Sequence, residues 1–256
     1  MQHPPFVKTL LSIWACALTG FATCKETPTS MDSAHPPRAA AAAARVRPAL
    51  EHDLAAAGLV FGSPVLLRAF KEELVLDLFV FHSKTQCFRF FRSYPIAASS
   101  GSLGPKLREG DGQVPEGFYQ VPSSAMKPDS RYHLAFNLGY PNAYDRSLGR
   151  TGSLIMIHGN RVSIGCLAMT DEKIEEIYTL CAAAQENGQR AFEVHVFPFR
   201  MTRERMGKTS GSPWEGFWKN LKQGYDLFEK TGRPARVSVK DGHYGFLAAP
   251  MRPKPL

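Results

Sequence analysis

A histidine and a cysteine lie eight residues apart in the stretch LIMIHGNRVSIGCLAMTDEKIEEIY, which runs from Leu154 to Tyr178. A thiol with an ordinary pKa of about 8.5 is only a few per cent ionised at neutral pH, so a nucleophilic cysteine needs a base. His158 is the nearest base to Cys166, and the residues between them could fold back to bring imidazole and sulfur together. The alternative is a tight buried turn that holds a hydrogen-bonded histidine. Spacing alone leaves both interpretations open.

Cys166 is the cysteine for which the sequence offers no structural explanation. It follows Gly165 and precedes a predicted helix by a few residues. Backbone N–H groups freed by glycine, together with a helix N-terminus, favour a thiolate and can receive an oxyanion. Cys181 instead falls on the apolar stripe of that helix, and Cys87 opens a predicted strand as a small apolar residue. We therefore expect chemistry at Cys166 and structural roles for the other two.

The same residues give little support to a metal site. Cys166 and His158 would supply two ligands, and His195 on a distant predicted strand a third, but no ligand-spaced partner accompanies them. The glycine-rich stretch GSLGPK lacks the Lys-Ser/Thr ending of a phosphate-binding loop, and no helical pattern follows it. The sequence therefore predicts neither a metal nor a cofactor.

The segments that must position these residues are mostly strands. Alternating apolar residues predict strands in SPVLLRAFKEELVLDLFVF (residues 63–81), in CFRFFRSYPIAA, in FYQV, in SLIMIHG, in AFEVHVFPF and in a last hairpin that turns at Asp241-Gly242. The second strand is expected to place Leu74, Leu76, Leu78 and Val80 on one face. Helices are predicted in TDEKIEEIYTLCAAAQENG, with Thr170 as N-cap, and in the aromatic segment PWEGFWKNLKQGYDLFEKTG. This pattern predicts a mainly β domain with a few packed helices.

The N-terminal residues predict export. Lys8 precedes an apolar stretch, residues 9–22, that is too short to span a bilayer but long enough for the core of a secretion signal. We therefore interpret residues 1–24 as a signal peptide and expect a periplasmic or cell-envelope location. Two alternatives remain for Cys24, namely lipidation, which would make the protein a lipoprotein, or simple cleavage near Ala22. Residues 25–58 are rich in Pro, Ser, Thr and Ala, and we expect a linker and a short helix there.

The composition limits the classes of partner. The chain of 256 residues is 44% hydrophobic and 21% charged, which is typical of a globular protein and not of a disordered one. A net charge of +8 favours anionic surroundings such as nucleic acid, phospholipid or an acidic polymer. No nucleic-acid partner is expected, because the sequence has no zinc-finger spacing, no aromatic RNA-binding pattern and no long Lys/Arg block. Membrane contact is expected only through a lipid on Cys24.

The residues around Cys166 resemble those of a known family. IMIHG, a short spacer and Ser-x-Gly-Cys ahead of a helix are similar to the L,D-transpeptidase catalytic (YkuD-type) domain, as is the upstream stretch GPKLREGDGQVPEGFY. MIHG-x-x-VSIGC-x-AMT, PNAYDR and an aromatic FW helix resemble its YafK-like murein L,D-transpeptidase subgroup. The resemblance covers roughly Leu59 to Val239 and implies a β-sandwich-type catalytic domain with a few packed helices. We accordingly expect this domain, with a C-terminal helix and strand extension, in residues 59–256.

The resemblance implies roles for the residues at matching positions. Cys166 would attack a peptide carbonyl attached to diaminopimelate. His158 would take the thiol proton and hand it to the leaving amine, with the Gly159 carbonyl orienting the imidazole. Backbone N–H groups around Gly165 and Cys166 would stabilise the oxyanion, and Ser163 would brace the turn.

Two departures from the family pattern bear on these roles. Ile164 stands where the family's second motif has a histidine, which leaves only His158 as a base. The spacer between His158 and Cys166 is much shorter than in the family, which removes a covering loop. The arginine that often follows the cysteine is also absent, so Arg161 and Lys106 are the nearest basic candidates for the substrate's carboxylates.

The resemblance implies periplasmic work on peptidoglycan and leaves three functional alternatives. A transferase would pass the acyl group from Cys166 to the amine of a second stem peptide. A hydrolase (amidase) of the same fold would use water to release a peptide or a wall-attached lipoprotein. A wall-binding module would keep the fold and the basic surface without turnover. Because the covering loop is short, the choice between an amine acceptor and water stays open.

Overall fold

Two five-stranded sheets, A and B, form the frame of this computed structural model, which describes residues 37 to 249. Sheet A has the order β3-β2-β1-β10-β5, sheet B has the order β4-β9-β8-β7-β6, and β11 and β12 form a separate hairpin. Sheet A contains β1 (Val65–Phe70), β2 (Val75–His82), β3 (Cys87–Pro95), β5 (Gly117–Pro122) and β10 (Ala191–Phe197). Sheet B contains β4 (Ala98–Ser99), β6 (Met126–Lys127), β7 (Ala135–Asn137), β8 (Met156–His158) and β9 (Leu167–Ala168), and the hairpin consists of β11 (Arg236–Lys240) and β12 (His243–Leu247).

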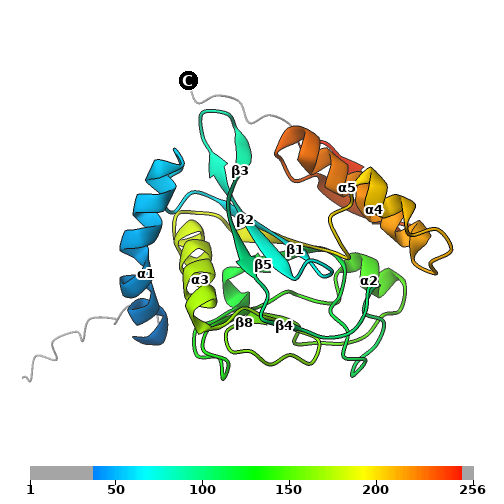
Figure 1. The fold of residues 1–256 in the computed structure, drawn as a ribbon, viewed down its shortest axis with the longest axis horizontal. Coiled ribbons are helices and arrows are strands. Elements are labelled where there is room, and N and C mark those ends of the chain that lie inside the picture. The colour runs from blue at the N-terminus through cyan, green and yellow to red at the C-terminus, as the bar shows by residue number, and fades with distance from the viewer. Residues whose placement is uncertain (1–36, 250–256) are drawn as a thin grey trace, which may run out of the picture. The chain divides into compact units, whose positions relative to one another are not determined.

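The helices lie on both faces of sheet A. They are α1 (Pro37–Ala56), α2 (Ala143–Ser147), α3 (Asp171–Glu186), α4 (Arg203–Gly207) and α5 (Glu215–Thr231), with a short 3-10 helix at Ser123–Ala125. Figure 1 shows α1 beside α3 on one side of the sheet, with α4 and α5 on the other side. The predicted mainly β fold with a few packed helices is confirmed by this arrangement of sheets and helices.

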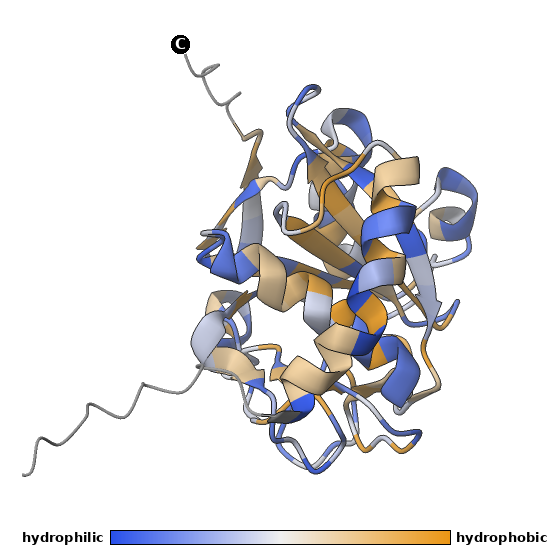
Figure 2. Cartoon of the chain, turned by 90° about the vertical axis from the view of Figure 1, so that its left-hand side faces the viewer, coloured by the Kyte–Doolittle hydropathy of each residue, from blue (hydrophilic) through white to orange (hydrophobic). Residues whose placement is uncertain are grey.

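Two apolar clusters hold these layers together. The larger cluster joins sheet A to sheet B and to the two helices on that side, and includes Leu54, Leu67, Ile157, Ile177 and Val194. The second cluster lies under α5 and is largely aromatic; Phe70, Phe118, Phe197, Trp218 and Tyr225 belong to it. Apolar residues are concentrated in the central strands in Figure 2. Sheet B, which carries the candidate chemistry, is therefore anchored through the larger cluster.

Local signals explain most element boundaries. The Thr170 hydroxyl accepts a hydrogen bond from the Lys173 N–H at the start of α3, as expected of an N-cap. Leu76, Leu78 and Val80 are buried on β2 as predicted. The prediction for Leu74 is wrong, because this residue sits in the preceding turn at φ 51° and is 45% exposed. A left-handed turn, and not strand alternation, decides its position.

The helix expected between residues 25 and 58 is a packing element. It spans Pro37–Ala56, and its Leu50 and Leu54 side chains are buried in the larger cluster. The predicted signal peptide and Cys24 lie outside the residues that the structure describes. Between residues 37 and 249, no helix is long and apolar enough to cross a membrane.

Candidate active site

His158 and Cys166 lie on two adjacent strands of sheet B. Strands β8 and β9 pair in parallel, with Ile157 opposite Leu167 and His158 opposite Ala168. Residues that are paired, or separated by two positions along a strand, point to the same face of a sheet. Cys166 directly precedes β9, so extending this register places it diagonally from His158 on one face. Such diagonal neighbours lie about 7–8 Å apart, within reach of a ring side chain.

The backbone and side chain of His158 are held on several sides. Its carbonyl accepts from the Met169 N–H at 2.8 Å, and the residue also pairs with Ala135 of β7. The Tyr132 ring lies against the imidazole with a centroid distance of 4.7 Å, and only 2% of His158 is exposed. Nδ1 lies 2.5 Å from the Gly159 carbonyl oxygen. Because a carbonyl can only accept, Nδ1 carries the proton and Nε2 is the basic nitrogen.

Glycine is required directly after the histidine. A Cβ at Gly159 would lie 2.5 Å from Asp171 Oδ1, 2.8 Å from the Tyr132 carbonyl oxygen and 3.0 Å from the His133 Cβ. The chain there runs between the N-terminus of α3 and the segment before β7, with Asn160 N–H donating to Asp171 Oδ1 at 2.7 Å. This close approach is what positions the Gly159 carbonyl for Nδ1.

The Cys166 thiol is part-buried and points at the backbone of β8. Its Sγ accepts from the Met156 N–H at 3.3 Å and lies 3.7 Å from the Leu154 carbonyl oxygen. No hydrogen bond joins it to His158 in the described part of the chain. The structure therefore brings the two predicted residues to neighbouring positions, with the thiol rotated toward β8.

Both reactive groups are neutral in this arrangement. Burial raises the pKa of the Cys166 thiol, while the Met156 N–H and the positive charge of Lys106 act in the opposite direction. Burial also lowers the pKa of His158, against the hydrogen bond with the Gly159 carbonyl. A thiol and a neutral imidazole, not a thiolate and imidazolium pair, are therefore the resting forms near pH 7.

Two serine hydroxyls occupy the N–H groups expected to stabilise an oxyanion. Ser163 Oγ accepts from the Cys166 N–H at 3.1 Å and donates to the Cys166 carbonyl at 2.6 Å. Ser100 Oγ accepts from the Gly165 N–H at 2.5 Å and donates to the Gly112 carbonyl at 2.8 Å. Gly165 adopts φ 102°, a conformation that favours glycine. An oxyanion could use either N–H only by displacing a hydroxyl.

The two basic candidates differ in their surroundings. Lys106 is 3% exposed and close enough to lower the pKa of Cys166, but its Nζ already pairs with Asp111 Oδ1 at 2.5 Å. Arg161 is exposed on the loop between His158 and Cys166. The pKa of Glu172 is lowered mainly by its hydrogen bond with the Thr170 side chain, and the charge of Arg161 acts in the same direction. Lys106 thus lies near the thiol with its charge balanced, and Arg161 lies on the rim.

A buried polar network holds the loop that carries Ser100 and Lys106. Lys71 Nζ donates to Glu116 Oε1 at 2.9 Å and to the Gly104 carbonyl at 2.8 Å. Glu116 also accepts from the Gly104 N–H at 2.7 Å and from Trp218 Nε1 at 2.8 Å. This network ties sheet A, the loop and α5 together. Sequence reasoning missed Ser100, Tyr132 and Glu116, and only the glycine-rich character of the loop indicated that it had a function.

Cys87, Cys166 and Cys181 are all unpaired thiols. Cys181 is fully buried on α3, whereas Cys87 is only part-buried at the start of β3. In residues 37 to 249, no group of three or more His, Cys, Asp or Glu side chains is arranged to hold a metal ion. Among the three thiols, Cys166 is therefore the one that lies beside a candidate base, His158.

Comparison with known proteins adds independent information. The sequence model of the family described as YkuD, L,D-transpeptidase catalytic domain, matches residues 83–237. Two curated relatives, both named "Putative L,D-transpeptidase YafK" and from Escherichia coli strains K12 and O157:H7, are each 48% identical over 185 residues, which is 72% of this chain and 74% of theirs.

Solved structures show a more distant likeness. The helical cell shape determining protein Pgp2 from Campylobacter jejuni is 18% identical with a TM-score of 0.44, over 70% of this chain and 73% of that chain. A mutant of the same protein is 22% identical with a TM-score of 0.44, over 65% of this chain and 59% of that chain. The match of the family model and the identity to the curated relatives decide the assignment: the chain belongs to the L,D-transpeptidase catalytic domain (YkuD) family.

Proposed function

We propose that this protein is an exported cysteine acyl-transfer enzyme that acts on peptidoglycan stem peptides at diaminopimelate. The observation that carries the proposal is the placement of His158 and Cys166 on adjacent paired strands, with Nδ1 of the histidine bound by the Gly159 carbonyl. Nε2 has no hydrogen-bond partner among the described residues and is free to act as a base. Membership of the family supports the same substrate class.

The proposed reaction starts from the neutral pair. Cys166 Sγ attacks the peptide carbonyl while His158 Nε2 takes the thiol proton, which gives a tetrahedral oxyanion and an imidazolium. The imidazolium then protonates the leaving amine, the C–N bond breaks, and a thioester on Cys166 remains. An acceptor amine, or water, then attacks the thioester while Nε2 takes its proton. The thiolate that leaves then recovers that proton from the imidazolium.

The reaction requires the thiol to turn toward His158. Rotation about the Cys166 side chain would break its contacts with the Met156 N–H and the Leu154 carbonyl. The Met156 N–H would then be an unoccupied donor beside the sulfur. It is a candidate to receive the oxyanion, in addition to the Gly165 and Cys166 N–H groups that we expected from the sequence.

The main alternative is a hydrolase of the same fold that releases a peptide or a wall-attached lipoprotein. The observation that favours water as acceptor is the solvent exposure of residues near Cys166 in the sequence, because Leu154, Val162 and Ile164 are 65%, 55% and 90% exposed. A third alternative, a wall-binding module without turnover, keeps the fold and the basic surface.

The test is incubation of the full chain with isolated peptidoglycan that still carries covalently attached protein, followed by mass spectrometry of the products. New links to diaminopimelate would support a transferase, and released protein or shortened stems would support a hydrolase. Cys166→Ala and His158→Ala should abolish either product. Cys87→Ala is the matched control, because it removes another part-buried thiol. Products that persist in Cys166→Ala would refute the assigned nucleophile, and absence of products with every variant would favour the wall-binding module.

Export and envelope location remain predictions from the first residues. Fractionation of cells that express the full chain, with and without a Cys24→Ala substitution, would test them. Membrane partition that depends on Cys24 would support a lipoprotein, and a periplasmic protein in both cases would support simple cleavage.

A further inference from the structure

A large cavity lies apart from Cys166, on the face of sheet A under the β11 and β12 hairpin. Its volume is about 670 Å³, and strands β5, β10 and β11 together with α2 line it. None of its lining residues contacts His158 or Cys166 through a hydrogen bond. The cavity is thus separate from the candidate active site, which belongs to sheet B.

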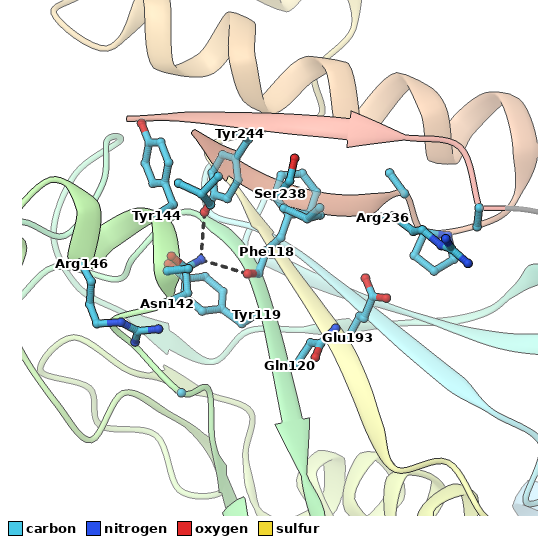
Figure 3. A pocket seen from close by; sticks show the side chains of 17 residues that line it. Phe118, Tyr119, Gln120, Asn142, Tyr144, Arg146, Glu193, Arg236, Ser238 and Tyr244 are labelled. Carbon is cyan, nitrogen blue, oxygen red and sulfur yellow. Dashed lines mark hydrogen bonds between the residues drawn. The ribbon is translucent and has the colours of Figure 1, made fainter. Parts of the chain in front are cut away.

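Polar side chains with few hydrogen-bond partners among the described residues lie along this cavity. Figure 3 shows Arg146 and Arg236 at opposite ends, with Gln120 and Glu193 between them. Gln120 and Glu193 are cross-strand neighbours on β5 and β10. Within residues 37 to 249, the side chains of Arg236 and Gln120 make no hydrogen bond, and the Arg146 side chain donates only to the Pro141 carbonyl.

Glu193 is the acidic group at the centre. Its Oε2 accepts from His195 Nε2 at 2.8 Å, while its Oε1 has no hydrogen-bond partner in the described residues. Burial lowers the pKa of His195, so the imidazole is neutral and does not cancel the charge of the carboxylate. One free carboxylate oxygen therefore faces the cavity between two arginines that form no ion pair in the described part of the chain.

The cavity also follows a strand with an unpaired edge. Residues 234–239, which include most of β11, line it, and among the described residues β11 pairs only with β12. An extended peptide can add to such an edge through main-chain hydrogen bonds, while its side chains reach separate polar groups. The edge of β11 along the cavity therefore suits an extended peptide.

We propose that this cavity is a second binding site, which holds a peptidoglycan stem peptide by its carboxylates and its free ammonium group. Charge complementarity selects this occupant. Arg146 and Arg236 suit carboxylates near the two ends of the peptide, and Glu193 and Gln120 suit the side-chain ammonium of a diaminopimelate residue between them. This inference rests on the proposed function for the nature of the peptide. It adds an anchoring site that keeps the enzyme on the wall while Cys166 engages another stem.

The test is calorimetric titration of the full chain carrying Cys166→Ala with a soluble stem tetrapeptide that contains diaminopimelate. We expect a binding event that Arg236→Gln weakens about tenfold, through loss of one charge-assisted hydrogen bond. Arg146→Gln should weaken it to a similar extent, and a peptide with amidated carboxylates should bind the parent as weakly. Arg89→Gln is the matched control, because Arg89 is also exposed, makes no ion pair between residues 37 and 249, and lies on β3, outside the cavity.

Two results would overturn the inference. One is an affinity that is the same for the parent, Arg146→Gln and Arg236→Gln, and the other is no binding by the parent at millimolar peptide. Turnover of the same peptide by the chain with Cys166 intact is measured separately. Turnover without arginine-dependent binding would refute this site alone, whereas arginine-dependent binding without turnover would support the site and refute catalysis.

Discussion

Replacement of Lys71 by methionine should strongly destabilise the protein. The Lys71 side chain is 4% exposed and the Glu116 side chain 0%, and their charged atoms lie 2.9 Å apart. Lys71 Nζ is also the donor to the Val114 carbonyl at 3.0 Å. Methionine fills a similar volume but supplies neither a charge nor a donor. Lys71→Met would therefore leave a buried carboxylate without its counter-charge.

The expected cost follows from that burial. Removing one partner of a buried ion pair costs about 3–5 kcal/mol, a large share of the roughly 5–15 kcal/mol that stabilises a typical domain. Adding Glu116→Gln removes the second charge. The Gly104 N–H donates to Oε1 of Glu116 and Trp218 Nε1 donates to Oε2, so the single amide oxygen of glutamine can keep one of these two hydrogen bonds. The double variant should therefore recover part of the loss.

Urea unfolding of the full chain, followed by tryptophan fluorescence and circular dichroism, measures these differences. Lys208→Met is the control, because Lys208 pairs with Glu204 while their side chains are 65% and 82% exposed. This control should cost less than about 1 kcal/mol. A cost of less than about 1 kcal/mol for Lys71→Met, or a double variant no more stable than the single one, would refute the reasoning.

Two further predictions concern catalysis and the first helix. Activity should rise with pH below about 6.5, as His158 with its lowered pKa loses its proton, and stay level to about pH 8.5, since the Cys166 pKa is raised. A pH–rate profile that falls from pH 7 would instead indicate an ion pair. Leu54 is fully buried on α1, so Leu54→Ala should lower the free energy of unfolding in urea by about 2–5 kcal/mol. His52 on the same helix is exposed, so the control His52→Ala should lower it by less than about 0.5 kcal/mol. Equal unfolding midpoints would exclude α1 from the cooperative unit.

The sequence predicted helices and strands correctly where the apolar residues followed a clear helical or strand periodicity. The apolar stripe of α3 and the alternation on β10 are examples, since Ile174, Ile177 and Cys181 are buried and so are Phe192 and Val194. Leu74 failed because its φ of 51° belongs to a turn, which no periodicity signals. The helix α1 was expected only as a short element, because its burial depends on a tertiary contact with α3.

For the candidate site, residue types pointed to His158 and Cys166 but not to their surroundings. The hydroxyl of Ser100 reaches the Gly165 N–H from 65 residues away in sequence, and nothing local marks it. The same holds for Glu116, whose partners Lys71 and Trp218 come from distant segments. Such long-range polar contacts depend on how the sheets and loops pack together. The spacing of residues within one sequence does not predict that packing.

The parallel pairing of β8 with β9 has a consequence for how this enzyme family can change. Parallel neighbours are usually joined by a dozen or more residues, yet only residues 159–166 connect these two. The separation of imidazole and sulfur is set by the strand ladder and not by the length of this connection. We therefore expect that residues inserted at the exposed tip, near Arg161, would leave the imidazole and the sulfur in place. Under the proposed function, variation of this loop would change the access of the acceptor without changing the His158 and Cys166 pair.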